Sequence, residues 1–197
     1  MNIKCDKKEC DGRCNPNIFT MASEVLAAGE LIVYPTETIY GIGGDAQLYP
    51  AICYKINTLK GAPMDKQISV AYSSIEQAAE FVDLPQKAIE LAERFLPGPL
   101  TIVIDTPEGT KGIRVPDHPL VKGIIEYFGP ITSTSANKHE MPPAEDIDSA
   151  NMQFGSDIQL YIDCGKKQSG VGTTVVKVND EIKILREGAI KRDDIIG

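Results

Sequence analysis

The segment that most constrains the fold of this chain is residues 33–46, VYPTETIYGIGGDA. The apolar run at residues 31–33 predicts a buried strand that ends at a proline-fixed turn. Glycines after such a turn let the backbone approach a ligand, and hydroxyl and N–H groups there can bind phosphate, carboxylate or amine groups. Taken alone, the segment also fits a proline turn followed by a bulged strand. The polar residues after the proline are Thr36, Glu37 and Thr38, and the glycines are Gly41, Gly43 and Gly44.

Length and composition indicate a single globular domain. A chain of 197 residues with 42% hydrophobic and 24% charged residues can bury a substantial core. The sequence has no apolar stretch of about 18 residues and no apolar signal-peptide core, so we expect a cytoplasmic protein without a membrane partner. The net charge of −8 disfavours a protein that holds nucleic acid mainly by neutralising phosphates, although it permits a local basic cleft.

The first fifteen residues differ in character from the rest of the chain. We interpret residues 1–15 as a cysteine-rich N-terminal arm and residues 16–197 as the domain proper. Cys5, Cys10 and Cys14 can hold zinc or an iron–sulfur cluster with a fourth ligand from elsewhere, but their C-x4-C-x3-C spacing lacks the usual C-x2-C pair. Free thiols are therefore favoured and no metal site is predicted. The two cysteines in apolar surroundings, typical of core residues, are Cys53 and Cys164.

Helical and strand periodicities interleave along the domain. Helices are predicted at residues 18–28, 49–59, 74–81 and 85–95 and after Asp117. Strands are predicted at residues 31–33, 68–72, 100–104 and 158–162, and residues 131–137 are predicted as a strand that becomes a hydroxyl-rich loop. A hairpin is predicted from residues 174–178 and 181–185, joined at an Asn179-Asp180 turn, and a polar loop at 105–112 leads to residues 113–116. Because some neighbouring strands form hairpins and others are joined by helices, we expect an α/β fold of the α+β type, with helices packed on a twisted mixed sheet.

Small hydroxyls or cations recur where predicted strands meet loops. A wall of such donors with few general bases suits the binding of phosphates and phosphoryl or nucleotidyl transfer. Neither histidine has a suitable nucleophile near it in sequence, so we interpret His118 and His139 as surface or loop residues. The recurring sets are Thr36 with Thr38, Lys60 with Lys66, Thr110 with Arg114, the group Ser133, Ser135 and Asn137, and Thr173 with Arg186.

Each of these sets also has a purely structural interpretation. Hydroxyls at residues 132–135 can satisfy loop backbone, and Arg114 and Arg186 can form surface ion pairs. Lys60 near a helix C-terminus meets the helix dipole favourably, and we interpret Glu37 as a hydrogen-bond acceptor in the turn. Only their convergence on one site would favour a functional role.

Seven segments occur in the order found in YrdC-like threonylcarbamoyl-AMP synthases, and the chain resembles that family over residues 19–190. The resemblance implies a single YrdC-like domain whose sheet surrounds a large concave cleft. It also implies that L-threonine, bicarbonate and ATP with Mg²⁺ are condensed into threonylcarbamoyl-adenylate and pyrophosphate. A separate transferase then modifies adenosine 37 of tRNA, and tRNA or double-stranded RNA would bind this protein only weakly. The segments are YPTETIYGIGGDA, KGAP, FLPGPLTIVI, IRVPDHP, TSTSAN, GTTVV and ILREGAI.

The family resemblance also implies roles for individual residues. Thr36 would contact threonine, Arg114 would pair with its carboxylate, and Ser133 and Thr173 would close the threonine pocket. Lys60 would face the phosphates or the bicarbonate-derived carboxylate as a catalytic residue. The residues expected around ATP are Lys60, Lys66, Thr110, Ser135, Asn137 and Arg186.

One position departs from the family pattern. Where the family has a lysine–any–arginine motif, this chain has Lys60, Gly61 and Ala62, so an arginine expected on the ATP phosphates is missing. We hypothesise that Lys66, about one helical turn further along, supplies the lost charge as a second catalytic cation, without the guanidinium fork.

Two other functions remain open from the sequence. One is a non-catalytic RNA- or nucleotide-binding protein of the same fold, which the missing arginine favours and the acidic net charge disfavours. The other is a carbamoyl-adenylate-forming domain similar to those of hydrogenase maturation proteins, although those domains sit in much longer chains. Threonine-dependent release of pyrophosphate separates the three.

Overall fold

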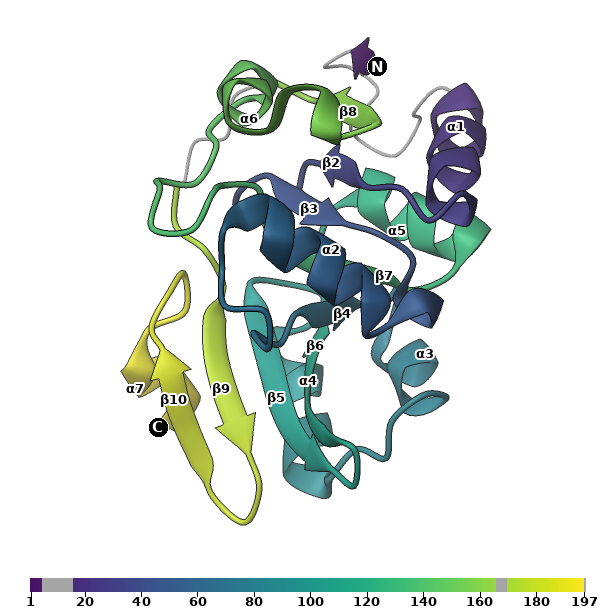
Figure 1. The fold of residues 1–197 in the computed structure, drawn as a ribbon. Helices are drawn as coiled ribbons and strands as arrows, with labels where there is room; N and C mark the ends of the chain where they lie inside the picture. Colours follow the sequence, from purple (N-terminus) through teal and green to yellow (C-terminus); the bar gives the residue numbers. More distant parts are fainter. Residues whose placement is uncertain (5–15, 166–169, 197) are drawn as a thin grey trace.

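The computed structural model describes residues 1–4, 16–165 and 170–196, and its strands form one ten-stranded mixed sheet (Figure 1). The strand order is β1-β8-β2-β3-β7-β4-β6-β5-β9-β10, with both parallel and antiparallel neighbours, so the predicted mixed sheet is confirmed. The strands are β1 (Asn2–Lys4), β2 (Ile32–Tyr34), β3 (Gly41–Gly43), β4 (Ser69–Ala71), β5 (Leu100–Thr106), β6 (Gly109–Arg114), β7 (Ile131–Ser135), β8 (Leu160–Asp163), β9 (Thr174–Val178) and β10 (Ile182–Arg186).

The predicted helices are all present, with bounds that shift by a few residues. Two short helices, α6 and α7, were not predicted. The sequence of α6 does contain a signal, since Ile147, Ala150 and Phe154 are spaced along one helix face and Asp146 begins a capping box, whereas α7 has only five residues. The α-helices are α1 (Pro16–Ala27), α2 (Ala51–Lys60), α3 (Ile75–Ala79), α4 (Gln86–Phe95), α5 (Pro119–Phe128), α6 (Ile147–Phe154) and α7 (Arg192–Ile196), and the 3₁₀ turns are η1 (Ala46–Leu48) and η2 (Gly155–Asp157).

The sheet around β2 is covered by helices on both faces. Successive side chains of a strand point to opposite faces. Ile32 and Tyr34 accordingly pack in the core cluster of α1 and α5, whereas Leu31 and Val33 pack in the cluster of α2 and α6 (Figure 1). All four side chains are at most 1% exposed, which explains why this strand reads as a continuous apolar run.

The sheet around β5 is covered by helices on one face only. Leu100, Ile102 and Ile104 pack with α3, α4 and α7 in a third core cluster. The alternate side chains, Thr101 and Val103, line a cavity on the opposite face. The same alternation continues into β6 and β9, so this uncovered face supplies the floor of the cavity.

The glycine-rich end of the opening segment forms β3, which pairs antiparallel with both β2 and β7. Gly41 lines the cavity, as expected for a glycine near a ligand. Gly43 has a different role, because a Cβ built there would lie 1.9 Å from the backbone oxygen of Thr132. That glycine lets β3 approach β7 and not a ligand.

The predicted loop at residues 105–112 is wrong, because Gly109 begins β6 and pairs with Thr106 of β5 in a hairpin. The apolar alternation expected of a strand is missing here. Thr110 and Gly112 face the cavity, and the tip of the hairpin is exposed.

The predicted arm at residues 1–15 differs in its first part from the structure. Asn2–Lys4 form β1, which pairs parallel with β8 at one edge of the sheet, and Ile3 packs against the core cluster of α1 and α5. The pairing partner lies so far along the chain that the sequence gives no local signal of it. Cys5, Cys10 and Cys14 lie outside the described residues, so the thiol predictions stay untested.

The two cysteines predicted as core residues are buried and partly buried, at Cys53 and Cys164 respectively. Within residues 1–4, 16–165 and 170–196, every helix is too short or too polar to span a bilayer.

Candidate active site

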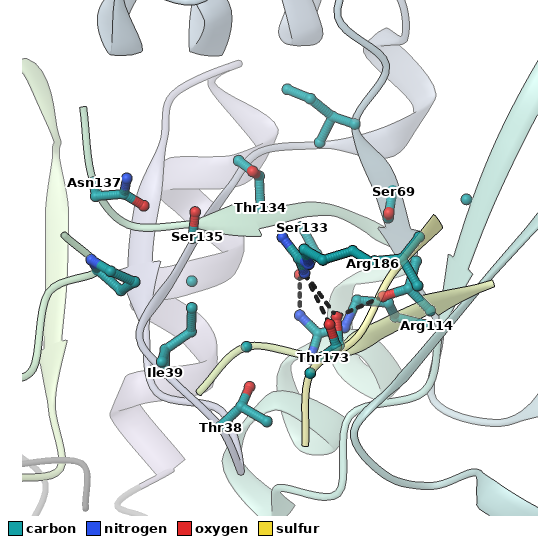
Figure 2. Close-up of a pocket in the computed structure, with 18 of the residues that line it drawn as sticks. Thr38, Ile39, Ser69, Arg114, Ser133, Thr134, Ser135, Asn137, Thr173 and Arg186 are labelled. Carbon is teal, nitrogen blue, oxygen red and sulfur yellow. Dashed lines mark hydrogen bonds between the residues drawn. The ribbon is translucent and has the colours of Figure 1, made fainter. Parts of the chain in front are cut away.

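The cavity on the uncovered face of the sheet has a volume of about 640 Å³ and gathers nearly all of the predicted site residues (Figure 2). It lies between the C-terminal end of α2, the strands β5, β6 and β7, and the segments flanking β9 and β10. Its lining is rich in hydroxyls and cations, as the sequence pattern indicated. The predicted residues that line it are Lys60, Lys66, Thr110, Arg114, Ser133, Ser135, Asn137, Thr173 and Arg186.

Lys60 is the last residue of α2 and is buried against the end of β7. Gly61 ends the helix in a left-handed conformation, with φ of 65°. The Nζ of Lys60 donates to the carbonyl oxygens of Ser135 and Asn137, the latter at 2.6 Å. Lys60 does lie at the C-terminus of a helix, where its charge meets the helix dipole favourably. The dipole is not its only partner, because the ammonium also contacts the end of β7 and lines the cavity.

Burial, followed by the nearby charge of Lys66, lowers the pKa of Lys60 to about 8. Lys66 is itself exposed and lines the same cavity. Its loop is held by Asn57, whose Nδ2 donates to the Lys66 carbonyl at 2.8 Å. Ala62, at the position of the missing arginine, is buried. The two lysines thus form one end of the cavity with two positive charges.

The predicted contact of Thr36 with a ligand is not supported, because Thr36 is the one predicted site residue outside the cavity lining. Its buried Oγ1 donates to the Ile39 carbonyl at 2.6 Å and accepts from the backbone N–H groups of Thr38 and Ile39. The Thr36 hydroxyl is therefore engaged in hydrogen bonds within its own turn and not directed at a ligand. Thr38, 3.0 Å away through its own Oγ1, is the residue of this loop that lines the cavity.

Arg114 ends β6 at the opposite end of the cavity from the lysines and is 7% exposed. Its Nη1 donates to Ser133 Oγ at 3.2 Å, and its Nη2 lies 3.1 Å from Glu37 Oε1. The interpretations of Arg114 as a surface ion pair and of Glu37 as a turn acceptor are therefore wrong. Their positions are 77 residues apart, so no local pattern indicates that they form a buried pair.

Arg186, the last residue of β10, joins Arg114 at this end of the cavity (Figure 2). Its Nη2 donates to the Thr173 carbonyl at 2.9 Å. Desolvation of the guanidinium, followed by the positive charge of Arg114, lowers the pKa of Arg186. Thr173 is buried and its hydroxyl lies 2.8 Å from that of Thr101. This arrangement places two guanidinium groups near each other, with the Ser133 hydroxyl beside Arg114 and the Thr173 hydroxyl beside Arg186.

The end of β7 supplies the polar groups between the two cationic ends (Figure 2). Asn137 is buried, and its Nδ2 donates to the carbonyls of Lys138 and Met141 while its Oδ1 has no partner among the described residues. Ser133 and Ser135 lie two positions apart on β7 and both line the cavity. Thr110 faces them from β6 and is half-buried.

Several lining residues were not assigned a role from the sequence. Thr101 follows Leu100 and precedes Ile102 in β5, so its hydroxyl at an alternate position was an available signal. Ser69 likewise precedes an apolar residue, Val70, in β4, whereas Thr134 lies between Ser133 and Ser135 in a part of β7 that is polar throughout. A polar residue at every second position of an otherwise apolar strand indicates a face that is not covered by a helix.

The chemistry that this cavity can support is the binding of anions and the positioning of a small polar molecule beside them. The carboxylates in the lining are those of Glu140 and Glu187. In the part of the chain that the structure describes, no group of three or more His, Cys, Asp or Glu side chains could hold a metal ion. The hydrogen-bond donors of the lining therefore suit phosphate and carboxylate groups. Their main contribution to catalysis would be the stabilisation of negative charge.

Comparison with known proteins identifies the family to which this chain is similar. A family model for Sua5, YciO and YrdC proteins, described as "Telomere recombination", matches residues 24–188. A putative threonylcarbamoyl-AMP synthase of Mycobacterium tuberculosis is 31% identical over 182 residues, which cover 86% of this chain and 83% of the relative. The threonylcarbamoyl-AMP synthase of Bacillus subtilis is 34% identical over 90% of this chain, which spans only 55% of that relative's length.

Solved structures agree with these sequence matches. Sua5 of Pyrococcus abyssi complexed with L-threonine superimposes with a TM-score of 0.88 at 29% identity, covering 100% of this chain and 60% of that protein. YciO of Escherichia coli superimposes with a TM-score of 0.85 at 21% identity over 98% of its length, which supports the fold alone. The order of segments, the fold and the cavity all agree with one conclusion: this chain belongs to the Sua5/YciO/YrdC family.

Proposed function

We propose that this protein is a threonylcarbamoyl-AMP synthase, which condenses L-threonine, bicarbonate and ATP into threonylcarbamoyl-adenylate and pyrophosphate. The observation that carries the proposal is the cavity of about 640 Å³, which has cations at two ends and hydroxyls along its lining. Such a cavity can hold an amino acid beside a nucleoside triphosphate, so that proximity and neutralisation of phosphate charge supply most of the catalysis.

The Arg114 end suits the amino acid. A guanidinium binds a carboxylate through a planar fork. Ser133 provides a hydroxyl beside Arg114, and Thr173 provides one beside Arg186. Thr38 replaces Thr36 as the proposed threonine contact from the β2–β3 loop, since Thr38 lines the cavity.

The Lys60 end suits the phosphates of ATP, because Lys60 and Lys66 are compact charges with three N–H donors each. Thr110, Ser135 and Asn137 would hold ribose or phosphate oxygens, and Arg186, which lines the same cavity, would add a further N–H donor for ATP. Magnesium is proposed as an ion carried by the ATP phosphates, since no cluster of carboxylates among the described residues could hold it.

The proposed reaction has two steps. The neutral threonine amine adds to carbon dioxide and loses a proton, or condenses with bicarbonate and loses water. Either route forms an N–C bond and gives the carbamate. A carbamate oxygen then attacks the α-phosphorus of ATP, the bond between the α- and β-phosphoryl groups breaks, and pyrophosphate leaves. A separate transferase would deliver the threonylcarbamoyl group to tRNA, because the net charge of −8 disfavours tight binding of RNA by this chain.

Pyrophosphate release tests the proposal directly. With purified protein and ATP, release is expected only when both threonine and bicarbonate are present, and omission of either should reduce it to background. Release that does not need threonine would contradict the proposal in favour of carbamoyl-adenylate formation. Salt-dependent tRNA binding without any release would instead indicate the non-catalytic alternative.

A further inference from the structure

The ion pair between Glu37 and Arg114 distinguishes the amino-acid end of the cavity. Glu37 Oε1 lies 3.1 Å from Arg114 Nη2, and the two side chains are 14% and 8% exposed. Arg114 is also held by Ser133, and Glu37 lies in the loop whose turn is fixed by Thr36. The carboxylate therefore neutralises the guanidinium at a defined place beside the cavity.

The other cations of the cavity are not neutralised in this way. Among the described residues, Lys60, Lys66 and Arg186 take part in no ion pair with a carboxylate. The end formed by Lys60 and Lys66 therefore carries two positive charges, which suits a polyphosphate. The guanidinium groups of Arg114 and Arg186 bring two further positive charges, and Glu37 neutralises that of Arg114 alone. Among the described residues, the lining carboxylates Glu140 and Glu187 form no ion pair with any of these four cations.

Two orphaned atoms argue that the pair is not there for stability alone. Glu37 Oε2 and Arg114 Nε are buried and have no hydrogen-bond partner in the described part of the chain. A buried ion pair contributes to stability only when its remaining polar atoms are satisfied, and otherwise it is a net cost. The pair is better explained by its effect on the charge of the cavity.

We propose that Glu37 is a positioning residue that acts through Arg114 and reserves this end of the cavity for an α-amino acid. An amino acid carries a carboxylate and an ammonium group, so it is attracted to Arg114 and tolerates the nearby carboxylate. A phosphate group carries only negative charge and is repelled by Glu37. ATP is then directed to Lys60 and Lys66. This inference rests on the proposed function, because it assumes that threonine and ATP share the cavity.

A charge-neutral variant tests the inference. Glu37→Gln keeps the size of the side chain and an oxygen that accepts from Arg114, so the loop is expected to stay in place. Calorimetric titration would compare three probes: L-threonine, inorganic pyrophosphate and 2,3-dihydroxybutanoate of the same configuration. The last compound replaces the ammonium of threonine with a hydroxyl and is a net anion of almost the same shape.

Wild-type protein is expected to bind threonine at least about tenfold more tightly than the hydroxy acid. In Glu37→Gln this preference should fall to near one, and pyrophosphate should become a competitor of threonine. In steady-state kinetics the KM for threonine should rise while kcat changes little. Glu126→Gln, which neutralises an exposed pair with Lys122 on α5, is the matched control and should bind all probes like wild type.

The wild-type comparison keeps the test decisive even if the variant fails to fold. Equal affinity of wild type for threonine and the hydroxy acid would overturn the role of Glu37 while leaving the proposed function intact. Unchanged preferences in a folded Glu37→Gln protein would overturn it too, and would assign the pair a structural role only. Failure of threonine to bind wild type, with and without a non-hydrolysable ATP analogue, would contradict the proposed function itself.

Discussion

Thr36 and Thr38 lie two positions apart in one loop and have different tasks. The Thr36 hydroxyl closes a buried turn through contacts with the backbone of Thr38 and Ile39. The Thr38 side chain faces the cavity (Figure 2). At the scale of single residues, the direction in which a hydroxyl points is decided by the local turn, and that direction separates structural from functional positions.

Substituting the two threonines should separate stability from substrate binding. Thr36→Val leaves a buried carbonyl and two buried N–H groups without their partner, so the free energy of unfolding should fall by about 1–3 kcal/mol. Thr38→Val should raise the KM for threonine with a smaller loss of stability. Urea unfolding and pyrophosphate-release kinetics on both variants check this. A Thr36→Val protein as stable as wild type would contradict the role of the turn.

The lowered pKa of Lys60 has opposite effects on stability and on binding. The folded protein loses this proton near pH 8, whereas the unfolded chain keeps it up to about pH 10.5, so stability is expected to rise between these values. The same loss of charge should weaken the affinity for ATP over the same range. The KM for ATP and thermal unfolding, each measured from pH 7 to 10, check both effects. In Lys60→Met the rise in stability should be absent, and its persistence would assign it to another group.

At the scale of elements, the end of α2 and the loop after it bring two lysines to one cavity. The loop at residues 62–66 is held by Asn57, whose Nδ2 donates to the carbonyls of Met64 and Lys66. The departure from the family motif at Ala62 is therefore compatible with a cation in this cavity, supplied by Lys66 from the same loop.

Removal of the Lys66 charge tests whether it compensates for the missing arginine. Lys66→Ala should lower kcat/KM for ATP by about tenfold or more, because a donor to the phosphates is lost. Lys66→Arg should retain most of the activity. Lys122→Ala, which removes an exposed lysine of α5 that is paired with Glu126, is the control and should leave the kinetics unchanged. Activity of Lys66→Ala equal to that of the control would exclude the compensation.

The sequence predicted elements and sites best where the signal was local or carried by the family resemblance. The β9–β10 hairpin was predicted from its alternation and its Asn179-Asp180 turn, and β9 has the predicted bounds. The pairing of Glu37 with Arg114 was not predictable, because contacts between residues 77 positions apart leave no pattern in either segment. β6 was missed since its polar residues face a cavity, so the apolar alternation of a covered strand is absent.

At the scale of the whole molecule, β1 and β10 are the two edge strands of the sheet. The edge at β1 is far from the cavity lining, which is drawn from α2, β3 to β7 and the segments around β9 and β10. Stability supplied by β1 and activity supplied by the cavity should therefore be separable.

A charged side chain introduced at the core-facing position of β1 tests whether stability and activity are separable. Ile3→Asp buries a carboxylate against the core cluster of α1 and α5, so the free energy of unfolding should fall by about 1–3 kcal/mol. The KM values for threonine and ATP should not change at temperatures where the protein stays folded. Met152→Asp, at a side chain of α6 that is 81% exposed, is the control and should unfold like wild type. A large change in KM for Ile3→Asp would show that the edge and the cavity are coupled.

The pairing of β1 with β8 also has a consequence for synthesis of the chain. Asn2 pairs with Tyr161 and β8 is the only strand beside β1 among the described residues, so β1 has no neighbouring strand until β8 has been translated. At about 5–20 residues per second, that strand waits on the order of ten to thirty seconds. During this interval its unpaired amide and carbonyl groups are open to chaperones or to nascent chains on neighbouring ribosomes.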